Sequence, residues 1–193
     1  MSSKYPSILP ELQVSFYFRL QAIKDLYFHE SLKNTIKELD IREIDSELSK
    51  FVSSKNLTKL AEYSLRGEAV FPIPLILKSN PFLLGYYRLL YGFSQKEFYS
   101  KGPFGRYKLM EERGKLTARA ESGMAELCYS LIYSAERLII ESGTLTLQTI
   151  AELQLLTVGP QLRGSMNNKY GQAATLKAFN LIKSLISNYI VHS

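Results

Sequence analysis

The sequence predicts a mainly α-helical protein, on three observations. Apolar residues recur at the spacing of helices along most of the chain. Residues that favour helix N-caps or first helical turns precede several of these patterns. With 193 residues and a hydrophobic content of 46%, the chain can bury a core, either as one large domain or as two small ones.

Two helices are expected in the first quarter of the chain. Residues 7–28 carry Leu12, Phe16 and Leu20 on one side, which is a helical spacing. Residues 32–52 are dense in Glu, Asp and Lys, and Ile44 and Leu48 belong to a narrow apolar stripe along this second helix.

The next segment combines helix starts with prolines. Asn56 and Ser79 each precede a helical pattern in the manner of an N-cap, and Pro81 suits a first helical turn. Between them, the sequence AVFPIPLIL at residues 69–77 is interrupted by Pro72 and Pro74. Because proline cannot donate a backbone hydrogen bond to a neighbouring strand, we expect an extended segment that crosses the core rather than a central strand.

The last part of the chain is expected to form helices over residues 121–141, 145–157 and 171–189. Residues 156–175, LTVGPQLRGSMNNKYGQAAT, contain three glycines and a proline, which is typical of a connecting loop. The expected organisation is therefore a helical N-terminal domain over residues 1–155, followed by a loop and a helix over residues 156–193.

The composition also indicates where the protein works. There is no run of 18 apolar residues and no apolar signal segment at the N-terminus, so we expect a soluble, cytoplasmic protein without a membrane partner. Cys128 is the single cysteine and excludes an internal disulfide. It lies in a helical pattern with no histidine nearby in sequence, which favours a small buried residue over a nucleophile.

The net charge of +6 is unevenly distributed. Residues 86–119 hold eight basic and three acidic side chains, and residues 153–193 hold four basic side chains and no carboxylate. A surface that binds a polyanion would have this distribution, and so would a basic face that is merely solvated. Charge alone leaves both interpretations open.

Few residues suggest chemistry. The two histidines and one cysteine do not have the spacing of a zinc site, and the phosphate-binding glycine motifs are missing. Asp45, Glu47 and Lys50 come nearest to a magnesium-dependent nuclease site, but their helical spacing favours a solvated charged face. We therefore expect no catalytic residue and no bound metal in this chain.

Signals for binding are stronger than signals for catalysis. In the segment LLYGFSQKEFYSKGPFGRYKLMEERGKL, aromatic residues alternate with cations, and they could stack on bases or pack in a core. Arg106, which follows Gly105, and Lys108, two residues later, are candidate phosphate contacts. The remaining candidate DNA-binding residues are Gln161, Arg163, Asn167, Asn168 and Lys169, whose side chains pair with bases or phosphates. Asparagine is also a common turn and N-cap residue, so the two asparagines have a structural alternative.

Three blocks of the sequence resemble a known family. LLGYYRLLYGFSQKEFY, GPFGRYKLMEERGKL and LQLLTVGPQLRGSMNNKYGQAAT, in this order, are similar to the XcyI family of type II restriction endonucleases, with similarity from about Glu11 onward. The resemblance implies a Mg²⁺-dependent endonuclease of the PD-(D/E)xK class within a restriction-modification system. It also implies a homodimer that cuts double-stranded DNA at a palindrome such as CCCGGG.

The sequence departs from the family pattern in its carboxylates. The resemblance implies a catalytic Asp and a Glu-x-Lys pair on a β-hairpin after a helix, yet no aspartate follows Asp45 and no carboxylate follows Glu152. We therefore expect the N-terminal, DNA-binding part of such an enzyme, which would precede an α/β nuclease core. This part would be inactive alone, with the core missing or supplied by a separate catalytic chain. Mg²⁺ is expected for the complete enzyme only. The alternatives are a helical DNA-binding module without a nuclease partner and a helical protein-interaction domain.

Overall fold

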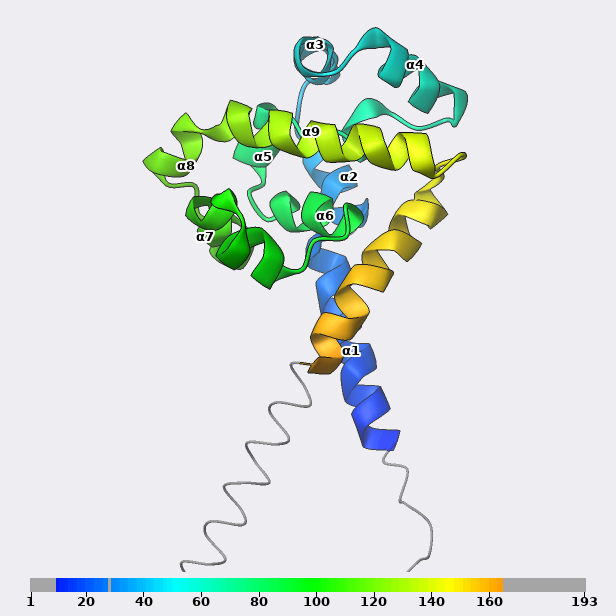
Figure 1. The fold of residues 1–193 in the computed structure, drawn as a ribbon, viewed down its shortest axis with the longest axis vertical. Coiled ribbons are helices and arrows are strands. Elements are labelled where there is room, and N and C mark those ends of the chain that lie inside the picture. Colours follow the sequence, from blue (N-terminus) through cyan, green and yellow to red (C-terminus); the bar gives the residue numbers. More distant parts are fainter. Residues whose placement is uncertain (1–9, 28, 165–193) are drawn as a thin grey trace, which may run out of the picture.

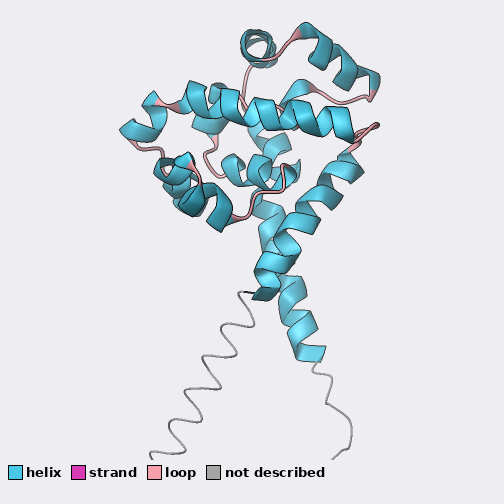
Figure 2. Cartoon of the chain, viewed as in Figure 1, coloured by secondary structure: helices cyan, strands magenta, loops and turns pink. Residues whose placement is uncertain are grey.

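The computed structural model describes residues 10–27 and 29–164, and within these residues the regular elements are helices without strands (Figure 2). The α-helices are α1 (Pro10–Tyr27), α2 (His29–Lys37), α3 (Ile41–Phe51), α4 (Ser54–Glu62), α5 (Pro74–Ser79), α6 (Leu83–Leu90), α7 (Lys108–Arg113), α8 (Ala118–Ser122) and α9 (Met124–Glu141). Shorter turns are the 3₁₀ helices η1 (Gly67–Ala69) and η3 (Pro103–Tyr107) and the π-helix η2 (Lys96–Lys101). A further helix covers residues 147–164. The expected mainly α fold is confirmed.

The helices form a body and a stalk. In Figure 1, α9 runs across the body, with α3 and α4 on one side of it and α5 and α6 on the other. The stalk consists of α1 and the helix over residues 147–164, which cross below the body (Figure 1). Leu20, Leu155 and Leu162 pack there against the buried Leu89 and Val158. None of the described helices is both long and apolar enough to cross a membrane.

The segment after η1 crosses the core, as expected from the sequence, but only part of it is extended. Phe71, Ile73 and Ile76 are fully buried, whereas α5 already begins at Pro74. Pro74 fits there because the first residue of a helix needs no backbone N–H. The next N–H, of Leu75, donates to the Glu47 carboxylate at 2.7 Å and is satisfied from α3.

Two tyrosines of α6 and the tyrosine at its C-cap hold this segment in place. Their hydroxyls donate to three consecutive backbone carbonyls, in the pairs Tyr87–Glu68, Tyr86–Ala69 and Tyr91–Val70. Burial raises the pKa of all three phenols well above the ordinary value. The hydroxyls therefore stay protonated as donors, and they satisfy carbonyls that have no strand partner.

Two helices expected as continuous are broken by caps. The helix expected over residues 32–52 is two helices, because Asp40 has an extended backbone and its carboxylate accepts from the Arg42 N–H at 2.8 Å. The helix expected over residues 121–141 begins instead at Met124, after the short α8. The N-cap of α4 is Ser53, whose hydroxyl accepts from the Asn56 N–H, so Asn56 is the recipient of the cap rather than the cap itself.

The loop expected from residue 156 onward is wrong up to residue 164, where the structure has helix. Gly159 and Pro160 suggested a break, but the apolar residues Leu155, Val158 and Leu162 are spaced as one helical face and pack in the stalk. The Thr157 carbonyl, which lies next to the proline, accepts from the Gln161 side chain at 2.6 Å. The remainder of the expected loop and the helix expected over residues 171–189 lie outside the described residues.

Candidate nucleic-acid interface

The aromatic residues between α6 and α7 pack in the core. Phe98, Tyr99 and Tyr107 are buried, and Phe93 and Phe104 lie partly buried against them. The Phe98 and Phe104 rings stack with centroids 4.7 Å apart. Of the two roles open from the sequence, core packing is therefore the one observed. The lysines and arginines of the same segment remain to form its outer surface.

The glycines of GPFGR have a packing role in this segment. A β-carbon at Gly102 would lie 3.0 Å from the Phe98 carbonyl oxygen, and one at Gly105 would lie 3.1 Å from the Tyr99 carbonyl oxygen. Both distances are shorter than those at which a β-carbon normally contacts another atom. The glycines thus allow η3 to pack directly on the backbone of η2, so they serve the turn rather than an anion.

The two candidate phosphate contacts in this segment are ion-paired. Arg106 donates to the Glu126 carboxylate at 2.8 Å, and its guanidinium lies 4.9 Å from the centroid of the Tyr107 ring. Glu126 raises the pKa of Arg106 above its already high value. Lys108 lies 3.5 Å from Glu112 one turn later in α7. A phosphate at either cation would have to share it with a carboxylate or replace that carboxylate.

Gln161 and Arg163 point to different sides of one helix. Residues two positions apart in an α-helix are separated by about 200° around the helix axis. The Gln161 side chain accepts from the Gln95 N–H at 3.4 Å and donates to the Thr157 carbonyl, so it faces the body. Arg163 is exposed, on the same face as Leu156, which is 72% exposed. Asn167, Asn168 and Lys169 lie outside the described residues.

A buried ion pair that sequence reasoning missed lies beneath this surface. Arg88 and Glu111 are almost completely buried and form two parallel hydrogen bonds, Nε to Oε2 at 2.8 Å and Nη2 to Oε1 at 2.7 Å. Burial raises the pKa of Glu111, but the hydrogen bonds and charge of Arg88 outweigh it, and the net pKa is below the ordinary value. The signal in the sequence was a single arginine within an apolar run.

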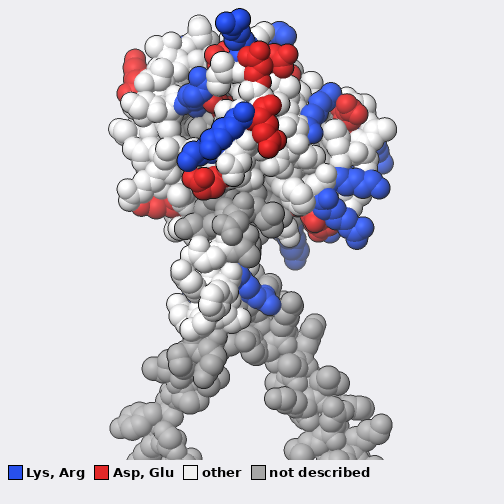
Figure 3. Space-filling view, turned by 180° about the vertical axis from the view of Figure 1, so that it is seen from behind, with Lys and Arg blue, Asp and Glu red and all other residues white. Residues whose placement is uncertain are grey.

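The excess positive charge of residues 86–119 therefore lies outside the core. Without the buried pair, the segment has seven basic and two acidic side chains, so the surplus of five is unchanged. Figure 3 shows Lys and Arg gathered on the side of the body that carries α7 and α8, whereas basic and acidic side chains alternate around α3. Within the described residues, no ion pair involves Lys96, Lys101, Arg113, Lys115 or Arg163.

The carboxylates of α3 serve the fold. Asp45 accepts from Arg66 at 2.7 Å, and Glu47 caps the start of α5. Throughout the described part of the chain, His, Cys, Asp and Glu residues form no cluster of three or more, and the two α3 carboxylates are already engaged by Arg66 and by the Leu75 N–H. These residues consequently do not fit the Mg²⁺ that the family resemblance implies.

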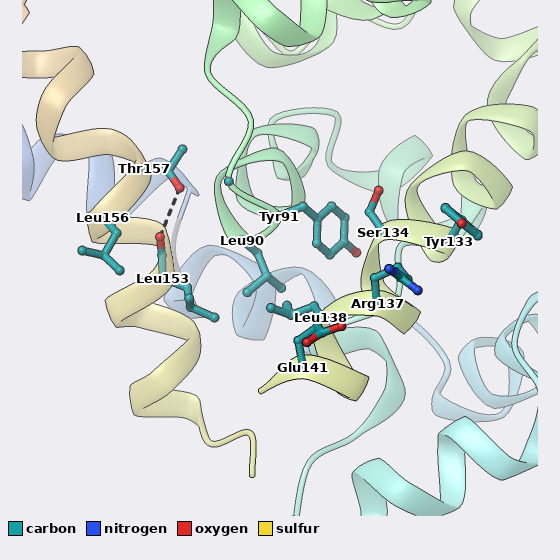
Figure 4. A pocket seen from close by; sticks show the side chains of 11 residues that line it. Leu90, Tyr91, Tyr133, Ser134, Arg137, Leu138, Glu141, Leu153, Leu156 and Thr157 are labelled. Carbon is teal, nitrogen blue, oxygen red and sulfur yellow. Dashed lines mark hydrogen bonds between the residues drawn. The ribbon is translucent and has the colours of Figure 1, made fainter. Parts of the chain in front are cut away.

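One cavity in the described part of the chain lies apart from the candidate DNA-binding residues. It has a volume of about 510 Å³ and opens between α9 and the helix over residues 147–164 (Figure 4). Its lining is mostly apolar and includes Tyr91, Tyr133, Leu138 and Leu153. None of the candidate DNA-binding residues lines this cavity.

The fold and the charge distribution define a helical domain with a basic surface on the side of α7 and α8, as a candidate nucleic-acid-binding protein would have. The XcyI restriction endonuclease family model matches residues 17–193. The chain is 40% identical over 195 residues to the type II restriction enzyme Cfr9I from Citrobacter freundii, covering 98% of this chain and 59% of the relative. It is also 40% identical over 184 residues to the type II restriction enzyme XcyI from Xanthomonas campestris pv. cyanopsidis, covering 93% and 55%. The chain belongs to the XcyI restriction endonuclease family.

The chain spans somewhat more than half the length of these curated relatives. No solved structure matches it at a comparable level of significance.

Proposed function

We propose that this chain is the DNA-binding part of a type II restriction endonuclease. The observation that carries the proposal is the surplus of five positive charges over residues 86–119, which remains at the surface once the buried pair is set aside. Lysine and arginine side chains without carboxylate partners bind duplex DNA by neutralising its phosphates. Membership of a restriction endonuclease family supports double-stranded DNA as the polyanion.

The candidate contacts fall into two groups. Lys96, Lys101, Arg113 and Lys115, which are exposed and unpaired within the described residues, are proposed to contact phosphates. Arg106 and Lys108 would join them by exchanging their carboxylate partners for phosphates. The proposed base-reading group is Arg163, Asn167 and Asn168, with Lys169 next in sequence, whereas Gln161 faces the body.

Cleavage is proposed to need residues beyond those described. Asp45 and Glu47 are engaged in the fold, and no carboxylate follows Glu152, so we derive no catalytic step from this chain. In the complete enzyme, Mg²⁺ and the catalytic Asp and Glu-x-Lys would belong to an α/β core. Residues 1–155 would then be the recognition domain and residues 156–193 the connection to that core. A homodimer on a CCCGGG-like palindrome remains part of the proposal.

Incubation of the purified chain with supercoiled plasmid and Mg²⁺ tests the assignment of catalysis. We expect no nicked or linear product, because the described carboxylates do not form a metal site. A digest with a commercial endonuclease on the same plasmid controls for the substrate. Mg²⁺-dependent cutting at a fixed site by this polypeptide alone would contradict the proposal.

Replacement of Arg163 with Ala tests the base-reading group. If Arg163 reads guanine, the variant should lose about 1–3 kcal/mol of discrimination at one base pair and keep its affinity for other sequences. If it contacts phosphate, all sequences should weaken alike. Selection from a random duplex pool, followed by affinity measurements on the winners, separates these outcomes. An Arg163→Ala variant with wild-type affinity and wild-type sequence preference would remove Arg163 from the interface.

A second candidate function is protein binding through the stalk. Val14, Tyr17 and Phe18 of α1 are 52%, 54% and 66% exposed, which is unusual for large apolar residues at helical spacing. This observation favours a helical interaction module over a solvated stalk. The two functions differ in their prediction for duplex DNA, which a pure protein-interaction module would not bind.

A further inference from the structure

We propose that the buried Arg88–Glu111 pair and Gln161 are positioning residues, which set the basic turn η2 in register with the helix over residues 147–164. This inference rests on the proposed DNA-binding function. It differs from that function in assigning Gln161 an internal role and in making a buried pair responsible for sequence discrimination.

The pair is the centre of a network that joins three segments. Arg88 comes from α6, Glu111 from α7, and the side chains of Gln95 and Tyr99 come from the turn between them. Glu111 Oε1 accepts from Arg88 and from Gln95 Nε2 at 3.0 Å, and its Oε2 accepts from Arg88 and from the Tyr99 hydroxyl at 2.6 Å. Arg88 also donates to the Phe93 carbonyl, so the start of the turn is held as well.

Such a network contributes more to geometry than to stability. Removing two charges from water costs several kcal/mol per ion, and an apolar pair of similar volume is often equally stable or more stable. Hydrogen bonds from several directions fix one arrangement, because displacement of any member leaves a buried polar group unsatisfied. A core made only of the surrounding Phe and Leu side chains would allow the turn to shift.

The network continues to the second basic segment through Gln95. The Gln95 side chain donates to Glu111, while its backbone N–H points to the Gln161 Oε1 at 3.4 Å. Gln161 in turn donates to the Thr157 carbonyl of its own helix. Each end of the Gln161 amide therefore has one partner within the protein. Gln161 links the two segments, and its side chain faces the body rather than the side of the helix that carries the exposed Arg163.

The register matters because each segment carries separate candidate contacts. Lys96 directly follows Gln95 in η2, and Arg163 lies two residues beyond Gln161 on the opposite face of its helix. Phosphate contacts set the register and orientation of a protein on a duplex, and base contacts specify the sequence. Fixing Lys96 relative to Arg163 would therefore couple the phosphate register to the base that is read.

The test is the double variant Arg88→Met with Glu111→Leu in the full chain. It replaces the ion pair by apolar side chains of similar size, so the fold should be retained, and helical circular dichroism with thermal melting checks that it is. We expect the ratio of affinities for a CCCGGG duplex and a scrambled duplex to fall about tenfold, the loss of one base contact. Affinity for the scrambled duplex should change less than about twofold, because sequence-independent attraction between cations and phosphates does not need one fixed position of the turn. An unchanged ratio in a folded double variant would overturn the proposal.

Hydrogen exchange measures the positioning without DNA. Amides of residues 94–107 should exchange at least about tenfold faster in the double variant, and those of α9 should keep their protection. Uniform loss of protection, or no loss in residues 94–107, would argue against a positioning role. If the wild-type chain shows no DNA binding, the proposed function fails, while this exchange result still decides whether the network positions the turn.

A single variant tests the positioning role if the double variant does not fold. Gln161→Ala removes the link between the segments and leaves the ion pair intact, and it should lower the specificity ratio with little effect on scrambled DNA. Tyr133→Ala, an exposed residue of α9 away from the network, is the matched control. Equal ratios for Gln161→Ala and Tyr133→Ala would contradict the role of Gln161.

Discussion

Replacement of Glu111 with Ala is expected to lower the free energy of unfolding by about 3–5 kcal/mol. The change leaves the Arg88 guanidinium buried without its carboxylate and removes the acceptor for Gln95 and Tyr99. Urea unfolding followed by circular dichroism measures the difference. The Arg88→Met/Glu111→Leu double variant is the control: it also leaves Gln95 and Tyr99 without their acceptor, but it leaves no charge buried without a partner, so it should lose clearly less stability than Glu111→Ala. A Glu111→Ala variant within about 1 kcal/mol of the wild type would show that the pair is not desolvated as described.

The same pair gives the expected pH dependence. The pKa of Glu111 is lowered in the folded protein, so its contribution to stability is present above the unfolded value of about 4.3 and is lost as the pH falls through the folded pKa. The wild type should therefore lose more stability than the double variant between neutral and strongly acidic pH.

Neutralisation of four exposed cations within residues 86–119 is expected to cause the largest loss of DNA affinity among the variants considered. In the variant Lys96→Gln, Lys101→Gln, Arg113→Gln and Lys115→Gln, the slope of log affinity against log salt should fall by about 0.9 for each residue that contacts a phosphate. These four side chains are exposed and form no ion pair within the described residues, so the fold should be unaffected. Fluorescence anisotropy on a labelled duplex gives both the affinity and the slope.

A matched control variant distinguishes the effect of where the charges lie from the effect of the net charge. Lys33, Lys37, Lys50 and Lys55 are exposed on α2, α3 and α4, and their change to Gln removes the same charge from another part of the body. The control should lower affinity only slightly, through net charge. Equal losses in the two variants would contradict a localised interface on the side of α7 and α8.

The fold was predictable where local signals agree with packing. Apolar spacing predicted the helical class and helix α1, and the buried position of Cys128 followed from its helical pattern. The break at Asp40 was missed although two signals mark it: aspartate is a strong N-cap, and Ile44 and Leu48 are out of phase with Ile36 and Leu39 in a single continuous helix. Pro160 led to the opposite error, a predicted break where the helix continues. Packing of Val158 and Leu162 in the stalk outweighs the cost of a proline in a helix.

The candidate site was predictable in composition but not in partners. The basic segment follows from residue types within one stretch, whereas the choice between base stacking and core packing for its aromatic residues needed the structure. The pairing of Arg106 with Glu126 and of Arg88 with Glu111 spans 20 and 23 residues, and only the fold brings these groups together. Gln161 looked like a base-reading residue because its chemistry suits one, whereas its contact with Gln95 depends on how the stalk meets the body.

The affinity of the wild-type chain for a short duplex, measured between about 50 and 200 mM salt, tests the central claim most directly. The basic face predicts binding with a log–log slope of about −0.9 for each phosphate contacted, hence a steep loss of affinity over this range. Absent binding, or binding that does not change with salt, would contradict the assignment of this chain as the DNA-binding part of its family.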